Sequence, residues 1–410
     1  METPWRKRAY DLLRLNFALF PGVAHYRAAG FIGPYYEAIR ARQNWLICLR
    51  NLIVFIGFQL WLPWRTLEVA KRWSKGDCWR RRTLAICRER FVDPNDIAMF
   101  RIEEASELDH YIRRFEHIGI GRAIANQSTD HSIFTTDKRA FYDHCAERQI
   151  PHPAVFATID DGEIDVISLP NSGDAVLIKP ACGSGGRGVQ IPARKSPDFA
   201  SSNSFVDWLG QLNTIRSGQW IAQRHLVAHP DLSDLAINAL PSVRVTTILN
   251  ESGEPEIVTT VLRFPKTAEM VIDNIGKGGL NAPVELETGR LGRCCAGMEP
   301  GEYERHPESG AQIEGRLVPH WAKLKELALT THANHFADHV MIGWDVAISA
   351  EGPLFLEANP RPSIIMAQRA PRLPAGKQRL GELIGYHLKM RQDFGQDKRR
   401  LLRAQPHDQF

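Results

Sequence analysis

Short apolar runs alternate with amphipathic stretches from about residue 130 onward. The runs predict strands and the amphipathic stretches predict helices, because strands and helices bury their side chains with different periods. The predicted strands cover 175–180, 188–191, 220–226, 242–249, 256–264, 341–349 and 353–360. The predicted helices cover 136–150, 204–212 and 321–340. This alternation is typical of α/β and α+β folds.

The most apolar run of the chain covers residues 51–64 and lies within a basic N-terminal portion. Residues 1–90 contain 17 Lys and Arg against 6 Asp and Glu, whereas the whole chain has a net charge of only +4. From 52 to 63 the run is too short to span a bilayer as a helix, and Arg50 bounds it. Length therefore favours a buried helix within a helical region over residues 1–95.

A second interpretation of the same run is a helix that lies in a membrane interface. It would place three tryptophans near lipid headgroups and three arginines against anionic lipid. These residues are Trp45, Trp61, Trp64, Arg80, Arg81 and Arg82. This interpretation implies a peripheral membrane contact through residues 40–90. A nucleic-acid partner is not expected, because no known binding motif accompanies the basic residues.

The composition is that of an ordinary globular protein, with 43% hydrophobic and 24% charged residues in 410, enough for two or three domains. Seven cysteines are scattered without a CxxC pair, which favours reduced thiols. The first residues include basic side chains but no apolar signal-peptide core. We therefore expect a cytoplasmic protein, located at the inner face of the membrane if the interfacial interpretation holds.

A glycine-rich loop joins the predicted strands at 175–180 and 188–191. Gly183, Gly185 and Gly188 satisfy the pattern GxGxxG, but a dinucleotide fingerprint needs a helix after the loop and a strand follows here. The loop is not a Walker motif either, because no Lys-Ser or Lys-Thr follows the last glycine. Glycines let backbone N–H groups approach an anion closely. We therefore predict a hairpin lid over nucleotide phosphates in preference to a merely flexible surface hairpin.

Two lysines are placed where they could reach the same phosphates. Lys179 ends an otherwise apolar strand, and a buried lysine needs an anionic partner to offset its desolvation. Lys138 starts the preceding helix, where a cation opposes the helix dipole and stabilises poorly. A second phosphate contact would explain that placement, although a solvated surface lysine explains Lys138 equally well when it is considered alone.

Asp345 and Glu357 are predicted to face each other across the last two strands. If the turn is centred on Glu351, the numbers of paired residues sum to 702, which pairs these two acids and puts Asn359 on the face of Glu357. Facing carboxylates repel unless a cation lies between them. Carboxylate and amide oxygens suit Mg²⁺ or Mn²⁺ rather than zinc. A register shift of one residue would leave two acids in water instead.

Three histidines, His332, His335 and His339, share one face of the predicted helix at 321–340. Neither a cysteine nor an HExxH pattern accompanies them, so a polar helix face is preferred to a zinc site.

Five segments resemble the ATP-grasp superfamily in their order and spacing. They are DKRAFYDHCAERQIPHP, VLIKPACGSGGRGV, WIAQRHL, SVRVTTIL and GWDVAIS with PLFLEANPRPSI. Within the superfamily the chain is most similar to the sugar-transfer-associated ATP-grasp family, because DNIGKGGLNAPVELETGRLG at 273–292 resembles that family's Asn/Gly-Gly segment. The resemblance covers about residues 130–375 and leaves residues 1–95 outside it.

The resemblance implies an α+β fold of the ATP-grasp type, in which two α+β lobes grip ATP, with a helical N-terminal region added. The expected division has four parts. They are a basic helical region over 1–95, an N-terminal lobe with the glycine-rich lid over 96–215, a C-terminal lobe with the metal site over 216–376, and a C-terminal helix and polar tail over 377–410.

The resemblance also implies the residues of the site. ATP would be bound by Lys138, Lys179, Gly183, Ser184, Gly185, Gly186, Arg187, Gly188 and the hinge residues Gln223, His225 and Leu226. The family's hinge often carries an acidic residue where this chain has Gln223 and Arg224. One or two Mg²⁺ or Mn²⁺ ions would be held by Asp345, Glu357 and Asn359. The transferred phosphoryl group would be faced by Arg244 and Arg361, with Lys277 as a further catalytic candidate.

Arg244 stands within an apolar and β-branched strand at 242–249. An arginine is always charged and grips phosphate or carboxylate through two hydrogen bonds. Without the resemblance, a structural ion pair explains its position equally well.

These parts suit phosphoryl transfer, in which catalysis consists mostly of positioning and charge neutralisation. Members of the superfamily typically phosphorylate a carboxylate, and an amine then attacks the acyl phosphate. The resemblance therefore implies an ATP- and Mg²⁺-dependent ligase that joins a small-molecule carboxylate to an amine. Its substrate would be a small metabolite or, by family resemblance alone, a precursor of a cell-surface saccharide or natural product.

Two alternatives to the ligase remain open at this point. One is a kinase on the same fold that phosphorylates a hydroxyl group. The other is a non-catalytic, membrane-peripheral protein that senses nucleotide. The sequence indicates neither the acid and its acceptor nor the oligomeric state.

Overall fold

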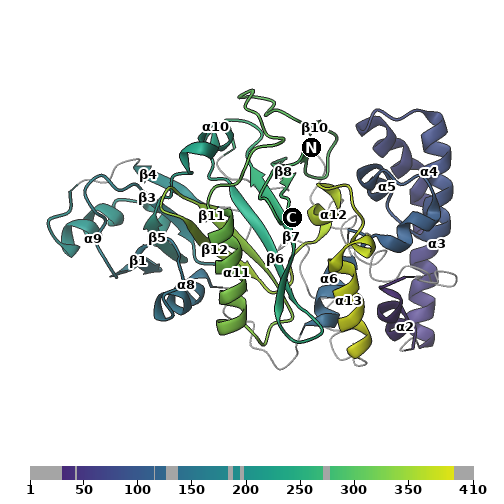
Figure 1. Cartoon of the computed structure of the whole chain (residues 1–410), viewed down its shortest axis with the longest axis horizontal. Helices are drawn as coiled ribbons and strands as arrows, with labels where there is room; N and C mark the ends of the chain where they lie inside the picture. Colours follow the sequence, from purple (N-terminus) through teal and green to yellow (C-terminus); the bar gives the residue numbers. More distant parts are fainter. Residues whose placement is uncertain are drawn as a thin grey trace.

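Two antiparallel β-sheets and a group of helices build the molecule (Figure 1). The computed structural model describes residues 30–41, 44–114, 116–125, 137–182, 188–193, 198–270 and 278–391. In Figure 1 the five-stranded sheet lies at one end of the molecule, the seven-stranded sheet in the middle, and the helices of residues 33–100 at the other end. The α+β class predicted from the sequence is confirmed.

The smaller sheet has the strand order β2–β1–β5–β3–β4, and all neighbouring strands are antiparallel. Its members are β1 (Val155–Asp160), β2 (Glu163–Val166), β3 (Val176–Pro180), β4 (Gln190–Ala193) and β5 (Gln219–Arg224). One face is covered by α9 (Ser202–Gly210), which places Phe205 and Leu209 in one buried cluster with Ile178 and Ala222. Because β5 pairs within this sheet, the expected lobe division at residue 216 separates a strand from its own sheet.

The larger sheet has the strand order β10–β9–β8–β7–β6–β11–β12 and is also antiparallel throughout. Its members are β6 (Ser242–Leu249), β7 (Pro255–Phe264), β8 (Leu280–Pro283), β9 (Cys294–Ala296), β10 (Glu302–Tyr303), β11 (Met341–Ile348) and β12 (Pro353–Asn359). Val243 and Leu262 pack with α11 (Trp321–His335) on one face. Val258 and Val261 belong to helix-lined clusters on the opposite face.

Helices from both ends of the chain cover that opposite face. They are α2 (Gly33–Ala41), α3 (Trp45–Arg72), α4 (Asp77–Arg90), α5 (Pro94–Phe100), the 3₁₀ helix η1 (Ala105–His110), α6 (Glu116–Ile124), α12 (Ile365–Arg369) and α13 (Arg379–Met390). Phe58 of α3 packs against Phe91 at the end of α4, with ring centroids 4.3 Å apart and the rings tilted. The same cluster includes Val261 of β7 and Ile365 of α12, so the N-terminal helices share a core with the sheet.

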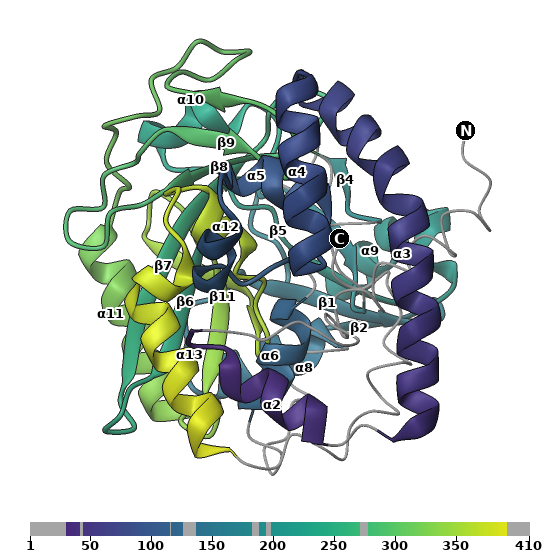
Figure 2. The same cartoon turned by 90° about the vertical axis from the view of Figure 1, so that its right-hand side faces the viewer.

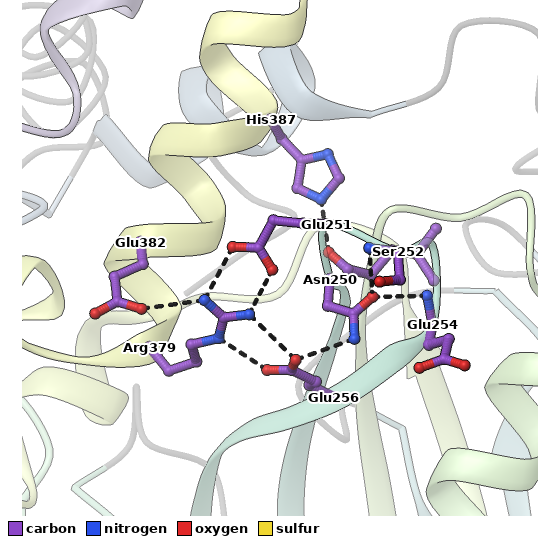
Figure 3. A network of polar contacts seen from close by, with 9 residues as sticks. Asn250, Glu251, Ser252, Glu254, Glu256, Arg379, Glu382 and His387 are labelled. Carbon is purple, nitrogen blue, oxygen red and sulfur yellow. Dashed lines mark hydrogen bonds and ion pairs between the residues drawn. The ribbon is translucent and has the colours of Figure 1, made fainter.

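The remaining short elements lie in connections. They are α8 (Lys138–Glu147) before β1, η2 (Asn213–Arg216) before β5, η3 (Pro230–Leu232) and α10 (Ser233–Ala236) before β6, and η5 (Ala375–Lys377) before α13. Helix α13 is also tied to the turn between β6 and β7, because Arg379 donates hydrogen bonds to Glu251 and Glu256 there (Figure 3).

Helix α3 differs from the prediction for the apolar run. It extends over 28 residues, well beyond the run at 51–64, and continues through Pro63. Its length and composition would allow it to cross a membrane, and it is the one helix in the described ranges for which this holds. The prediction of a buried helix is correct for one face, where Phe58 and Leu62 are buried, and wrong for the other, where Leu60 is 78% exposed.

Most strands that the sequence predicts are present near their expected bounds, and β6 matches the run at 242–249 residue for residue. Strands β1, β2, β8, β9 and β10 were not among those predicted. The helix predicted over 321–340 ends at His335, and Phe336 follows as its C-cap.

Candidate active site between the two sheets

A row of charged side chains crosses the larger sheet at the level of Asp345. Arg244 on β6 pairs with Asp345 on β11, and Asp345 pairs in turn with Glu357 on β12. Directly paired residues point to the same face of a sheet, so these three side chains are neighbours. The predicted opposition of Asp345 and Glu357 is therefore confirmed.

The register that produces this opposition has an unexpected origin. Near the turn, partners sum to 701 rather than 702, as in the pair of Ile348 with Pro353. A β-bulge between Asp345 and Val346 shifts the register, because Leu356 on β12 has no partner of its own there. Beyond the bulge the pairs sum to 702, as for Gly343 with Asn359. A bulge re-aims the side chains next to it, and here it brings the two acids face to face.

Asp345 is held by two arginines. Arg244 donates to both carboxylate oxygens through Nε and through Nη2, the latter at 3.0 Å, and Arg263 of β7 adds a contact from Nη2 at 2.9 Å. All three side chains are largely buried, with exposed fractions of 18% or less. Burial opposes ionisation of Asp345, but the two guanidinium groups outweigh it and hold the pKa of the carboxyl below its usual range.

Lys179 connects the smaller sheet to this row. Its Nζ donates to the Tyr142 hydroxyl at 2.7 Å, and that hydroxyl donates to the Leu356 carbonyl at 3.0 Å. Tyr142 belongs to α8, whereas Leu356 directly precedes Glu357 on β12. Two hydrogen bonds thus join the strand before the glycine loop to the strand of the predicted metal site.

The two lysines and Glu357 influence one another electrostatically. Burial and the neighbouring Lys138 lower the pKa of Lys179 to about 7, while Glu357 acts in the opposite direction. Burial and Asp345 raise the pKa of Glu357 above its usual range, although nearby lysines oppose this rise. Such opposed shifts require that the groups be close together in a poorly solvated place. Lys179 and Glu357 therefore share one site.

Helix α8 positions Lys138 as predicted. The helix begins at this residue, and Asp137 caps it by accepting a hydrogen bond from the Arg139 amide at 2.9 Å. The Lys138 amide donates to the carbonyl of Ala181 at 2.9 Å. This bond fixes the first turn of α8 to the segment that leaves β3, so both lysines approach the site from neighbouring backbone.

The glycine loop lies between two strands that form an antiparallel hairpin, as predicted. Gly188 has φ +79°, and a Cβ at this position would lie 2.8 Å from Cγ of Pro180, so only glycine fits there without strain. Four further glycine-loop candidates and Arg187 lie outside the described residues; they are Gly183, Ser184, Gly185 and Gly186.

The predicted hinge residues follow one another at the end of β5. Gln223 is buried, and its Oε1 has no hydrogen-bond partner among the described residues. It pairs with Leu177 of β3, two residues before Lys179, and so shares a sheet face with that lysine. The His225 amide donates to the Ala175 carbonyl at 2.8 Å, and Leu226 is buried.

The other predicted residues are placed as follows. Asn359 ends β12 opposite Gly343, on the face of Glu357. Arg361 lies two residues further on, against Gly121 of α6, where an added Cβ would meet its Cβ at 3.4 Å. Lys277 lies outside the described residues.

Three contributors to the site were not predicted from the sequence: Arg263, Tyr142 and Asn281. Arg263 carries the same signal as Arg244, a guanidinium in an otherwise apolar strand, and could have been found by it. Asn281 of β8 pairs with Arg263, is fully buried, and has no partner for its Oδ1 within the described ranges. Tyr142 gave no such signal, because a buried tyrosine in a helix is ordinary core.

The three histidines predicted to share a helix face do not lie on one helix, because α11 ends at His335 and His339 lies beyond it. His332 is buried between the Thr247 hydroxyl, at 2.7 Å from Nδ1, and the His339 carbonyl, at 2.8 Å from Nε2. Burial lowers its pKa to about 4, so it is neutral at physiological pH. Across the described residues, no group of three or more His, Cys, Asp or Glu side chains is arranged to hold a metal ion.

The chain was compared with family models, curated proteins and solved structures. Residues 125–373, more than half of the chain, match the family model described as sugar-transfer associated ATP-grasp. Similar solved structures include a D-alanine–D-alanine ligase from Bacillus anthracis, with 13% identity, a TM-score of 0.33, and coverage of 63% of this chain and 69% of that one. An L-amino acid ligase from Bacillus licheniformis shows 10% identity, a TM-score of 0.34, and coverage of 62% and 48%.

Comparison with curated proteins gave no match. The family match covers all strands of both sheets, from β1 to β12, together with the lysines and the paired acids. The chain therefore belongs to the sugar-transfer-associated ATP-grasp family.

Proposed function

We propose that the chain is an ATP- and Mg²⁺-dependent ligase that activates a carboxylate as an acyl phosphate for attack by an amine. The observation that carries the proposal is the gathering of cationic side chains around a pair of carboxylates in a poorly solvated place. Four cations, Lys138, Lys179, Arg244 and Arg263, surround two carboxylates, Asp345 and Glu357. Buried charge of one sign is costly unless an opposite charge balances it. A polyphosphate with its metal ion and a substrate carboxylate are ligands of the charge types that these cations and carboxylates bind.

The residues present fit the nucleotide. The orphaned Gln223 Oε1 can accept a hydrogen bond from an amino group such as that of adenine. Lys179 shares its sheet face and is followed by the glycine hairpin, so the two ends of the smaller sheet would hold the base and the phosphates respectively. A lowered pKa of Lys179 also fits an ammonium whose anionic partner is supplied by a ligand.

The residues also fit a divalent cation, with one qualification about Asp345. Glu357 and Asn359 offer the carboxylate and amide oxygens that Mg²⁺ and Mn²⁺ prefer. Both oxygens of Asp345 already accept from guanidinium groups, with one contact at Oδ1 and two at Oδ2, so Asp345 has less capacity left for a metal than Glu357 and Asn359. When bound, the cation would neutralise phosphate charge. Proximity of a cation would also favour the ionised form of Glu357.

The protein's own side chains would act mainly by position and charge. A substrate carboxylate oxygen would attack the γ-phosphorus, and the bond to the bridging oxygen of ADP would break. Arg244 and the two lysines would neutralise the charge on the transferred group. An amine would then attack the acyl carbon, and phosphate would leave with its oxygen. Activation is needed because hydroxide is a poor leaving group, and a closed hairpin would keep water from the acyl phosphate.

The proposal is tested by measuring ADP release from ATP and Mg²⁺ with pooled small-molecule acids and amines. Glu357→Gln should abolish acid-dependent release, while Glu382→Gln, the same change on the surface of α13, should not. Phosphate and an amide should appear with ADP. A stable phosphorylated hydroxyl would assign a kinase instead, and equal release by the wild type and Glu357→Gln would overturn the assigned site.

A further inference from the structure

Helix α3 carries an apolar stripe on its exposed face. The stripe repeats at three- and four-residue spacing, which keeps its members on one side of the helix. Its members and exposed fractions are Trp45 72%, Leu49 51%, Leu52 48%, Ile53 63%, Ile56 51%, Leu60 78%, Trp64 58% and Leu67 37%. Soluble proteins rarely expose a continuous apolar surface of this length, and those that do use it to bind a partner or a membrane.

The opposite face of α3 is part of the protein core. Val54, Phe58 and Leu62 belong to a buried cluster with α4 and α5. Arg65 is 3% exposed and bonds Glu68 at 2.8 Å and Asp93 at 3.4 Å. If α3 crossed a bilayer, these ion pairs and the helices packed on α3 would have to enter the bilayer with it. The helix is therefore built to lie along a surface, with the stripe alone facing outward. Figure 2 shows α3 along one edge of the molecule.

The charged residues next to the stripe indicate which kind of surface α3 would contact. Lys71 continues the face of the stripe, five turns beyond Ile53 at i+18 and about two turns beyond Trp64 at i+7. Lys75 and Arg81 are exposed in the following turn and in α4. The described stretch 44–90 contains ten Lys and Arg against three Asp and Glu. Tryptophans at both ends of an apolar face, with lysine and arginine beside it, are typical of helices at a lipid headgroup boundary.

We propose that α3 docks this chain on an anionic lipid surface, with the stripe in the headgroup boundary and the cations of the α3–α4 turn against lipid phosphates. A second copy of the chain fits the stripe less well, because it would bring a surface with the same basic excess over 44–90 and no acidic counterpart. In Figure 1 the helix lies at the end of the molecule opposite the five-stranded sheet. Docking would therefore leave the glycine hairpin and the hinge strand facing away from the lipid.

The test is sedimentation of the full chain with vesicles of phosphatidylcholine alone and with phosphatidylglycerol added. We expect binding to the anionic vesicles that falls with added salt. The triple variant Leu52→Ser, Ile56→Ser, Leu60→Ser should weaken it at least about a hundredfold. Lys71→Ser, Lys75→Ser and Arg81→Ser should each weaken it about fivefold.

The matched control changes three exposed apolar side chains outside the stripe, Ile167, Leu317 and Leu373, to serine. It should bind vesicles like the wild type. Melting curves of both triple variants should match the wild type, because the altered side chains are exposed.

Four results would overturn the proposal. They are equal binding to neutral and anionic vesicles, equal loss of binding in the two triple variants, a dimer in solution that the stripe variant dissociates, and vesicle binding that appears only when residues 1–29 are deleted. The last result would mean that the stripe binds the chain's own residues 1–29 rather than lipid.

Discussion

Two arginine–carboxylate networks of this molecule have opposite charge balance and opposite burial. At the sheet centre, Arg244 and Arg263 grip the single carboxylate of Asp345, and all three side chains are at most 18% exposed. At the surface, Arg379 of α13 is surrounded by three glutamates, of which Glu251 and Glu382 are 47% and 65% exposed (Figure 3).

The difference separates a structural network from a functional one. An acid excess in water is screened by solvent and ions, so the network of Arg379 needs no further partner. At the sheet centre, two guanidinium groups share one carboxylate where solvent screens little, and Lys179 of β3 and Lys138 of α8 act on the neighbouring Glu357. Under the proposed function, a bound polyphosphate would add negative charge to this place. Under the proposed function, the same kind of ion pair is a tether in one place and part of a binding site in the other.

The largest expected effect is on turnover. Glu357→Gln and Lys179→Met should each reduce acid-dependent ADP release by about a hundredfold or more, because each removes a charge that would face the transferred phosphoryl group. Glu382→Gln and Lys323→Met make the same chemical changes on exposed helices and should leave the rate unchanged. The comparison fails if the buried and the exposed variants lose activity equally.

The second effect is on stability. Asp345→Asn leaves two buried guanidinium groups without their carboxylate and should lower the free energy of unfolding by about 3–5 kcal/mol. Urea titration of wild type and variant measures this difference. Since the folded pKa of Asp345 is depressed, its contribution is present above the unfolded pKa and is lost as the pH falls through the folded value. A variant as stable as the wild type would show that the two arginines do not depend on this acid.

A third effect is the uptake of a proton on ATP binding. Free Lys179 has a pKa of about 7 and loses its proton as the pH rises above that value, whereas a bound phosphate would restore the charge. Calorimetry at pH 8 in buffers of different ionisation enthalpy should show an uptake that Lys179→Met lacks. Uptake that is the same in both proteins would place the titrating group elsewhere.

The same pKa shift has a consequence for folding. The unfolded chain binds the Lys179 proton up to pH 10.5, while the folded chain releases it near 7. Between these values the unfolded state binds more protons, so stability should rise with pH. Lys179→Met should flatten that rise, as measured by urea titration at pH 7 and at pH 9.

The smallest effect is expected at the surface network. Arg379→Gln breaks hydrogen bonds to Glu251 and Glu256, whose pKa values it lowers, but all three groups lie near water. We expect a change in melting temperature of at most about 2 °C and no change in turnover. A loss of several degrees would mean that α13 depends on this tether more than an exposed network allows.

The sequence predicted the residues of the candidate site better than the strand register that brings them together. Arg244, Asp345 and Glu357 were found because charged residues in apolar strands are conspicuous and strand pairing is periodic. The sum of 702 was derived from a turn that in fact gives 701, and only the bulge at Leu356 restored it. The residues near Leu356 do not predict a bulge, because bulges depend on the packing of both strands.

Other structural features could not be predicted, because they depend on tertiary contacts that the hydrophobic pattern of a single sequence does not show. The shortness of the run at 51–64 favoured a buried helix, but α3 is longer than the run, and the described residues bury only one of its faces. Strands β8 to β10 are two to four residues long and lack a clear alternation. Tyr142 joins the two sheets through a carbonyl that is 214 residues away in sequence.

Equilibrium binding of ATP with Mg²⁺ to the full chain tests the central claim most directly. If the buried cations are half of a polyphosphate site, the wild type should bind, Lys179→Met should bind about ten- to a hundredfold more weakly, and Lys323→Met should bind like the wild type. Absence of binding by the wild type, or equal affinity in all three proteins, would contradict the account.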